Sequence, residues 1–417
     1  MGTAPSRAWE GSASGRAGGG HMTFTISRRT FLAAAALAPV TTRLAMAAGA
    51  PLRIGYSMCL TGLFAQAAPS QVNAYELWKD QVNAAGGLDI GDGQRRPVEF
   101  VSYDDQSNPA NAVRIYEKLI TQDKVDLLAA PWSTPIHLAI APVLARHKFP
   151  MVGNTAASVK LREVKPGYIW FPTAVIPDKV GEELAAFMAR ENVKTAAVFA
   201  NVLPLAQEIK TYLLPALEKN GIKLVANEDF PPDIKDMTTL ISGANQSSPD
   251  AFIVLSYPSD TFLFATQAKQ LNVKAPFVLS LIGPTIQAYQ QAFGTGANNM
   301  VTVGHWSPNQ SKWPRAKPFF DAYLAKYKEA PDALDSVLSF MSMEILAQAV
   351  ATAGLDKEKL RETIASATFD TINGPVKFDG VQNTATPTSF LQIQDGSLEL
   401  VWPESIKTRD FRPKTGW

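Results

Sequence analysis

The chain has 417 residues, of which 46% are hydrophobic and 18% charged, and this length and composition predict a globular protein of two domains. The formal net charge of +1 excludes the strongly basic composition that is typical of nucleic-acid-binding proteins. The single cysteine, Cys59, excludes an internal disulfide framework or a cysteine-built zinc site, and no apolar run from residue 51 onward approaches the ~20 residues that span a bilayer.

The N-terminal segment, residues 1–47, predicts export rather than part of the fold. Residues 1–21 are rich in Gly, Ala and Ser and lack periodicity, which indicates an upstream extension or a cloning remnant. Paired arginines then precede a short apolar run, and residues 27–32, SRRTFL, resemble the twin-arginine export signal. The small residues Ala-Met-Ala at 45–47 fit a cleavage site. We therefore expect a soluble, periplasmic protein whose mature chain starts near Ala48.

Apolar runs and amphipathic stretches alternate along the next hundred residues. Runs of Val, Ile, Leu and small residues predict strands at residues 51–59, 98–103, 125–132 and 150–154. Apolar residues spaced three and four apart predict helices at residues 71–87, 111–122 and 137–148. This order with short connections is typical of a parallel sheet that helices cover on both faces.

The alternation resumes after a break at residues 168–178 that contains two prolines. Strands are expected at residues 195–201, 222–230, 251–257, 276–281, 375–379 and 390–395. Helices are expected at residues 181–192, 205–221, 237–244, 261–271, 318–329 and 336–354. The predicted fold class is α/β with two doubly wound parallel sheets, and such sheets bind ligands at the carboxyl ends of their strands.

Two adjacent acids, Asp104 and Asp105, raise the question of a metal or catalytic site. Adjacent residues on an extended chain point to opposite sides, so the two carboxylates cannot easily face one substrate. The ligand spacing of a calcium loop is also absent. Ser107 or Asn108, followed by Pro109, instead provides a helix start. We interpret the stretch as a turn.

Several motifs in chain order carry a resemblance to a known family. They are IGYSMCLTGLFAQ, NAAGG, YDDQSNPANAV, APWSTP, PMVGNTAAS, SPDAFIVLSYPSD, PFVLSL and NGPVKFD. Together they resemble the leucine/isoleucine/valine-binding family of periplasmic solute-binding proteins, and the resemblance covers about residues 52–395. Each motif is weak alone, but their shared order behind an export signal is specific.

The resemblance implies two doubly wound parallel-sheet lobes joined by three crossover strands, the type I periplasmic binding protein fold. One lobe would comprise residues 52–173 with 302–372, and the other residues 174–301 with 373–417. A hinge would close the lobes on a small solute. The partners implied are the membrane permease and ATPase of an ABC importer, with no cofactor and no metal.

The resemblance also implies where a carboxylate would bind. In the family, the loops after the third and fourth strands bind it through a serine, backbone N–H groups and a hydroxyl. Here these loops carry Ser133 and Thr134, and the segment Thr155, Ala156, Ala157 and Ser158. Helix N-termini and small side chains favour an anion. Ser133 could instead cap the helix that follows it, and the two roles can coexist.

The second lobe departs from the family pattern at two positions. Leu281 stands where the family has an acid for the ammonium group, and Leu205-Ala206 replaces a tyrosine-glycine pair. An unpaired ammonium in an apolar pocket costs several kcal/mol, so these departures disfavour α-amino acids. Asp260 stays open as an ammonium partner, although a solvated helix start accounts for it as well.

Aromatic residues are expected at the rim of the same cleft. Tyr56, Phe64, Trp132 and Tyr257 lie at loop positions there, together with Gln66, although ordinary packing would also explain each ring. Such rings suit an apolar or aromatic body attached to a carboxylate. We therefore expect an aromatic or 2-oxo acid, with branched-chain amino acids as the alternative.

Other function classes find less support in the sequence. No G-x-S-x-G, H-E-x-x-H or P-loop pattern occurs, so no catalytic residues are predicted and an enzyme is disfavoured. A sensory receptor, in which the loaded lobes activate a membrane partner, would have the same sequence features as a transport receptor.

Overall fold

The computed structural model describes residues 50–91, 93–163 and 167–417. The predicted export signal lies outside the described residues. The first strand in the chain is β1 (Leu52–Met58), an apolar run that is buried at six of its seven positions. It lies between β4 (Val98–Asp104) and β5 (Leu127–Leu128), and both pairings are parallel.

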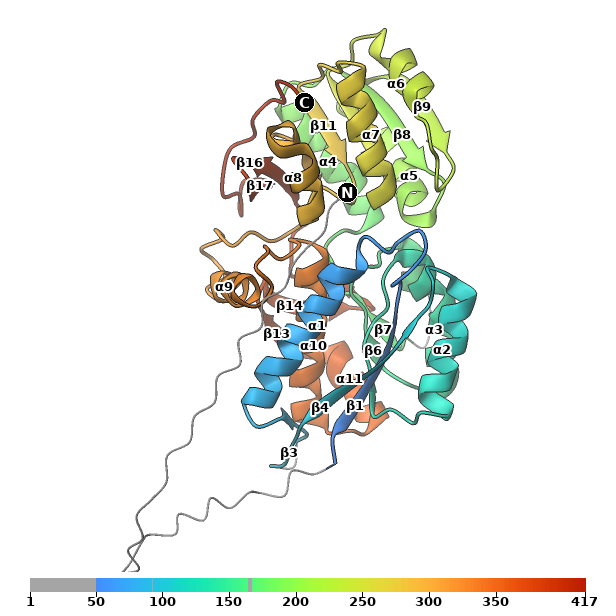
Figure 1. Ribbon diagram of the computed structural model, residues 1–417, viewed down its shortest axis with the longest axis vertical. Coiled ribbons are helices and arrows are strands. Elements are labelled where there is room, and N and C mark those ends of the chain that lie inside the picture. Colours follow the sequence, from blue (N-terminus) through green and yellow to red (C-terminus); the bar gives the residue numbers. More distant parts are fainter. Residues whose placement is uncertain (1–49, 92, 164–166) are drawn as a thin grey trace, which may run out of the picture. The chain divides into compact units, whose positions relative to one another are not determined.

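Helices cover this three-stranded sheet on both faces (Figure 1). On one side, α1 (Ala68–Ala84) packs against α10 (Asp335–Ala353), which comes from much later in the chain. On the other side, α2 (Pro109–Thr121) packs against α3 (Thr134–His147). The carboxyl ends of β1, β4 and β5 therefore open into loops between two helical layers.

A seven-stranded sheet forms from the second half of the chain. Its order is β17-β16-β12-β11-β10-β8-β9. The strands are β8 (Thr195–Asn201), β9 (Lys223–Phe230), β10 (Ala251–Leu255), β11 (Phe277–Ser280), β12 (Val301–Val303), β16 (Phe390–Gln394) and β17 (Ser397–Trp402). The pairings from β9 to β12 are parallel, whereas β16 and β17 add an antiparallel hairpin.

Four helices flank the parallel part of this sheet. They are α4 (Pro177–Arg190), α5 (Pro204–Lys219), α6 (Thr238–Asn245) and α7 (Pro258–Gln270). In Figure 1, α4 and α5 lie on one face and α6 and α7 on the other. The predicted doubly wound α/β class is confirmed.

The remaining elements are short or peripheral. The helices are α8 (Gln287–Phe293), α9 (Ala316–Tyr327), α11 (Lys357–Ser366) and the 3₁₀ turns η1 (Val159–Glu163) and η2 (Gly294–Ala297). The strands are β2 (Leu88–Asp89), β3 (Arg95–Arg96), β6 (Met151–Val152), β7 (Ile169–Trp170), β13 (Thr368–Thr371), β14 (Gly374–Asp379) and β15 (Gln382–Asn383). The predicted elements do not include β2, β3, β7, β13, β15, α8, α11 or the two 3₁₀ turns, nor strands β12 and β17 of the seven-stranded sheet.

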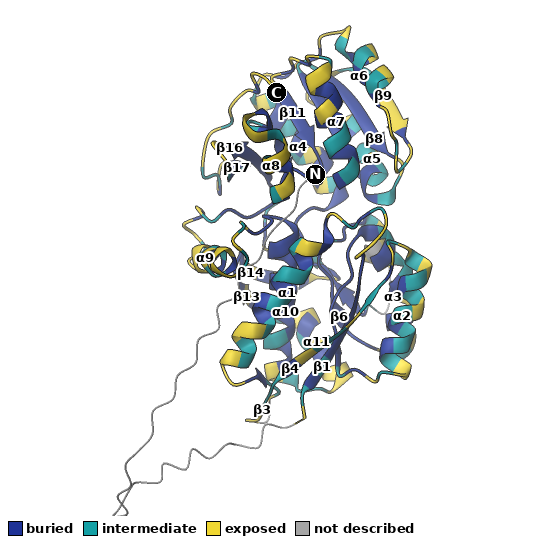
Figure 2. Cartoon of the chain, viewed as in Figure 1, coloured by how far each residue is buried: buried dark blue, intermediate teal, exposed yellow. Residues whose placement is uncertain are grey.

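Helix α10 is the most apolar helix of the described chain. By length and composition it could cross a membrane, contrary to the expectation from the sequence that no apolar run is long enough. However, 67% of its apolar window is buried inside the protein. Figure 2 shows this burial along the helix. A core helix passes the same test, so α10 is weak evidence for a membrane span.

Candidate functional site

Loops that follow strands form a cavity. Its lining comes from the segments after β5 (residues 132–134), β6 (155–157) and β7 (173–175), and from residues after β8, β10 and β11. The first turn of α10 completes the wall. Because the carboxyl ends of parallel strands are where open α/β sheets bind ligands, we take this cavity as the candidate site.

Ser133 has the most unusual geometry of the lining residues. Its φ of 82° and ψ of 146° lie in a region that residues with a side chain rarely adopt. It is 1% exposed, and its hydroxyl has no hydrogen-bond partner among the described residues. It also makes no side-chain capping bond to α3, so the capping role considered from the sequence is not realised. The fold therefore holds a strained serine whose hydroxyl it does not use.

Neighbouring groups hold the Ser133 backbone in place. Its carbonyl accepts from the backbone N–H of His137 at 3.1 Å and lies 2.8 Å from His137 Nδ1. Burial lowers the pKa of His137 to about 4, so the ring is neutral at pH 7 and the proton on Nδ1 makes this bond. The Ser133 N–H donates to Thr155 Oγ1 at 3.3 Å. These bonds offset the cost of the strained conformation.

The loop after β6 is tied to the same place. Thr134 Oγ1 accepts from the Ala157 N–H at 3.2 Å and lies 3.3 Å from the Ala157 carbonyl oxygen. Both loops therefore present small side chains and the N-terminus of the 14-residue helix α3 to the cavity. Helix N-termini stabilise anions, and no lysine, arginine or histidine lines the described cavity wall.

The rest of the wall is mainly apolar. The ring of Trp132 lies 5.1 Å from that of Phe64 and 6.4 Å from that of Tyr257, measured between centroids. The aliphatic lining residues are Val175, Leu205, Ile282, Leu334 and Leu338. The cavity is narrow, about 30 Å³, which holds the centres of only a few waters. A larger solute therefore requires the lining to move.

The structure brings together seven of the twelve residues predicted for the site. The seven that line the cavity are Trp132, Ser133, Thr134, Ala156, Ala157, Leu205 and Tyr257. Phe64 does not line it but contacts the rings of two residues that do. The other four lie outside the cavity wall.

Each of these four residues has another environment. Tyr56 packs inside the sheet against Tyr75 and Phe100, and Gln66 is exposed. Ser158 donates through its hydroxyl to Glu208 at 2.6 Å. Leu281 is fully buried, and the next residue, Ile282, lines the cavity instead.

Asp335 is the lining residue that sequence reasoning most clearly missed. Its Oδ2 accepts from Trp132 Nε1 at 2.9 Å, and its side chain is 3% exposed. Thr173, Val175, Ile282, Leu334 and Leu338 were missed as well. The one available signal was the acidic pair Asp332 and Asp335, just before and at the start of a long, largely apolar helix.

The turn after Asp104 and Asp105 and the acid Asp260, both considered from the sequence, make hydrogen bonds within the protein at helix starts. Asn108, preceding Pro109, accepts from the N–H groups of Ala110 and Asn111, which confirms the predicted helix start. Asp260 also lies at a helix start, but it is buried rather than solvated, and it accepts from Asn201 and from the Tyr257 N–H. In the described chain, no group of three or more His, Cys, Asp or Glu side chains could hold a metal.

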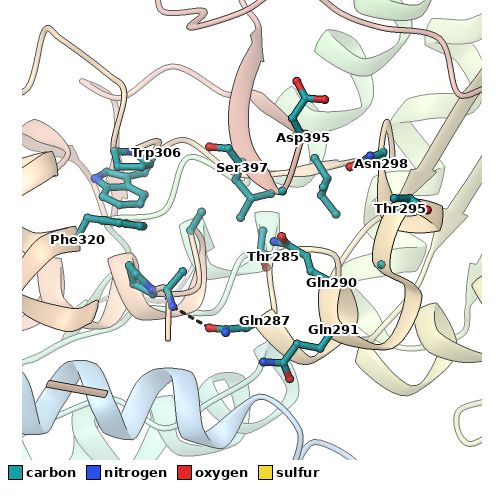
Figure 3. Close-up of a pocket in the computed structure, with 18 residues that line it drawn as sticks. Thr285, Gln287, Gln290, Gln291, Thr295, Asn298, Trp306, Phe320, Asp395 and Ser397 are labelled. Carbon is teal, nitrogen blue, oxygen red and sulfur yellow. Dashed lines mark hydrogen bonds between the residues drawn. The ribbon is translucent and has the colours of Figure 1, made fainter. Parts of the chain in front are cut away.

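A second cavity lies between α8, the turn between β16 and β17, and the segment around α9 (Figure 3). It is larger, about 560 Å³, and its lining combines apolar side chains with amide and hydroxyl ones such as Gln287, Gln290 and Asn298. Its one charged lining residue, Asp395, pairs with Arg412 at 2.9 Å. None of the predicted site residues lines it.

Comparisons with known proteins agree with this arrangement. The sequence matches the family model described as periplasmic binding protein over residues 51–397. Leu/Ile/Val-binding protein homolog 7 of Brucella melitensis biotype 1 is 22% identical over 388 residues, which cover 88% of this chain and 94% of that protein.

Two solved structures with similar folds were determined with different ligands. The branched-chain amino acid transporter substrate binding protein LivJ of Streptococcus pneumoniae, in complex with isoleucine, has a TM-score of 0.75 at 22% identity, over 85% of this chain and 100% of that one. An ABC transporter solute binding protein of R. palustris, in complex with benzoate, has a TM-score of 0.75 at 17% identity, over 88% and 100%. At these identities the likeness concerns the fold alone.

Proposed function

The chain belongs to the periplasmic binding protein family, as a solute-binding receptor of an ABC importer, and we propose that its solute is a small organic carboxylate. An aromatic or 2-oxo acid is favoured. The permease and ATPase of the importer are the proposed partners. The proposed location is the periplasm, reached by the twin-arginine route.

The geometry of Ser133 carries this proposal. A buried polar group without a partner costs about 1–3 kcal/mol, and an unusual backbone conformation adds a similar cost. A solute oxygen that accepts from the Ser133 hydroxyl would remove the first cost. The N-terminus of α3 favours an anion, and because no basic side chain lines the described wall, neutral donors would hold it.

The other wall supports an apolar body for the solute. Val175, Leu205 and Ile282 surround the space with aliphatic carbon, and Trp132 adds an aromatic face. Leu281, which stands where the family has an acid, is buried, and its backbone bonds to Val254 and Thr302. An ammonium group would therefore lack an acid from that strand, which disfavours leucine-like solutes.

We also propose the two-lobe division predicted from the sequence, with residues 52–173 and 302–372 in one lobe and residues 174–301 and 373–417 in the other. Because the cavity is narrow, hinge motion between lobes would admit the solute. Backbone hydrogen bonds cross the last of these boundaries. Phe171, in the first proposed lobe, donates to the carbonyl of Val381 and accepts from the N–H of Asn383, and both of these residues are in the second proposed lobe.

A thermal-shift panel tests the proposal. It would compare branched-chain amino acids, benzoate-type acids and 2-oxo acids on the full chain. We expect the aromatic or 2-oxo acids to raise the melting temperature and leucine to leave it unchanged. Stabilisation by leucine, with none from the desamino acids, would contradict the proposed solute class and support the branched-chain alternative.

A further inference from the structure

Asp335 is the only acidic side chain among the described residues that line the cavity. It begins α10 and stands next to Leu334, with Leu338 one turn further along the same wall. Its bond to Trp132 connects it to the carboxylate-binding loop, because Trp132 immediately precedes Ser133. The indole of Trp132 therefore lies between the Ser133 hydroxyl and the Asp335 carboxyl in one cavity.

The two oxygens of the Asp335 carboxyl have different surroundings. An indole N–H can only donate, so Oδ2 is the acceptor of the bond from Trp132. Within the described part of the chain, no hydrogen bond to Oδ1 is found and no basic side chain pairs with the carboxyl. Oδ1 is therefore the atom left for a solute.

The neighbouring acid Asp332 favours the protonated, neutral form of the Asp335 carboxyl. Asp332 is also buried, and its Oδ1 accepts from the N–H groups of Leu334 and Asp335 at 2.7 Å each. Burial, followed by the nearby Asp332 carboxyl, raises the pKa of Asp335 well above its usual range. A neutral Asp335 that accepts at Oδ2 carries its proton on Oδ1, and so presents an O–H donor to the cavity.

We propose that Asp335 is a specificity-determining residue that donates to an uncharged oxygen, a hydroxyl or carbonyl, which the solute carries apart from its carboxylate. This inference rests on the proposed function, because it assumes that the carboxylate occupies the Ser133 end of the cavity. The solute class is then a hydroxy- or oxo-substituted carboxylic acid with an apolar body. An amine in this position would require an ionised Asp335 beside Asp332.

The test measures calorimetric affinities of the full chain for benzoate, its 2-, 3- and 4-hydroxy derivatives and 4-(aminomethyl)benzoate. The quantity compared is the ratio of the best hydroxybenzoate affinity to the benzoate affinity. The variants are Asp335→Leu, which removes the polar group, and Asp335→Asn. Asparagine can accept from Trp132 through its oxygen and donate to the solute through its amide nitrogen, as neutral aspartic acid would. Asp395→Asn, in the second cavity, is the control.

We expect a ratio of about tenfold or more in the wild type and in the control. The ratio should fall to near one in Asp335→Leu and stay within about threefold of wild type in Asp335→Asn. Any of four results would overturn the inference. They are a wild-type ratio near one, a ratio in Asp335→Leu equal to that of the wild type, a ratio near one in Asp335→Asn, and tighter binding of 4-(aminomethyl)benzoate than of the hydroxybenzoates.

Two further results complete the design. If Asp335→Leu does not fold, the Asp335→Asn ratio together with the aminomethyl comparison decides the question. If benzoate binds without any hydroxyl preference, the inference fails while the proposed function stands. If none of these carboxylates binds, and leucine does, both fail together.

Discussion

The loops after β4 and β5, the two strands that flank β1, use their polar groups in opposite ways. In the loop after β4, the buried Asp105 accepts from Ser57 Oγ at 2.6 Å and from the Ser107 N–H at 3.0 Å. In the loop after β5, the Ser133 hydroxyl is equally buried and has no described partner. Ser107 also has a positive φ, of 60°, so strain occurs in both loops. What distinguishes them is whether the fold uses the polar atoms.

This difference separates groups that stabilise the fold from groups left for a ligand. A carboxylate whose bonds are all internal should affect stability when it is removed. A hydroxyl whose bond is missing should affect binding instead. Substitutions in the two loops can therefore test the comparison directly.

The largest effect is expected from Asp105→Ala. The substitution leaves the buried Ser57 hydroxyl without its acceptor and opens a void, so the free energy of unfolding should fall by about 2–4 kcal/mol. Chemical denaturation measures this change. Asp105→Asn is the control, because it keeps the side-chain volume and an acceptor oxygen and should lower the free energy of unfolding by less. A fall below about 0.5 kcal/mol would show that the loop does not depend on this acid.

Ser133→Ala should weaken solute binding by about 1–3 kcal/mol, because the proposed bond to the carboxylate is lost. The free energy of unfolding should stay the same or rise, since the fold makes no bond to this buried hydroxyl and alanine removes an unpartnered polar group. Ser57→Ala is the matched control, and it should reverse the pattern by lowering stability while sparing affinity. Unchanged affinity in Ser133→Ala would remove Ser133 from the site.

Glu344 extends the comparison to pH. Burial is the main cause that raises its pKa to about 7, opposed by Arg315, which donates to it at 2.7 Å. The folded state therefore keeps the proton to a higher pH than the unfolded chain, whose glutamate titrates near 4.5. The stability that Glu344 contributes is present below about pH 4.5 and is lost as pH rises through about 7.

The measurement is the free energy of unfolding of wild type and Glu344→Gln between pH 4.5 and pH 7.5. We expect the wild type to lose about 1–2 kcal/mol relative to the variant, a discounted value because Arg315 is partly exposed. Parallel pH profiles would contradict the raised pKa.

The smallest effect is expected from Ser133→Gly compared with Ser133→Ala. Glycine adopts a φ of 82° and a ψ of 146° without strain, so the glycine variant should be about 1 kcal/mol more stable. Both variants lack the hydroxyl and should bind the solute weakly. Equal stability, measured by chemical denaturation, would indicate that the Ser133 backbone is not strained.

The comparison also shows how far the sequence predicts the molecule. Apolar runs and helical spacing predicted the two doubly wound sheets, and Asn108-Pro109 predicted a helix start, because these signals are local. Ser133 could be placed at the site, but its φ and its unused hydroxyl could not be foreseen. They depend on contacts with His137 and Thr155.

The missed residues have two physical reasons. Asp335 meets Trp132 across 203 positions of sequence, and no local pattern reports such a contact. Leu281 and Ile282 differ by one residue, and on an extended chain that step turns the side chain to the opposite face. Tyr56 is directed into the core by packing on Tyr75.

The central claim is that the Ser133 end of the cavity binds an anionic carboxylate. Calorimetric titration of the full chain with matched acid and amide pairs, such as benzoate and benzamide, tests it most directly. We predict that the acid binds at least tenfold more tightly than its amide, because helix N-terminal dipoles and hydroxyl donors favour the charge. Equal binding of acid and amide, or binding of neither together with tight binding of leucine, would contradict the account.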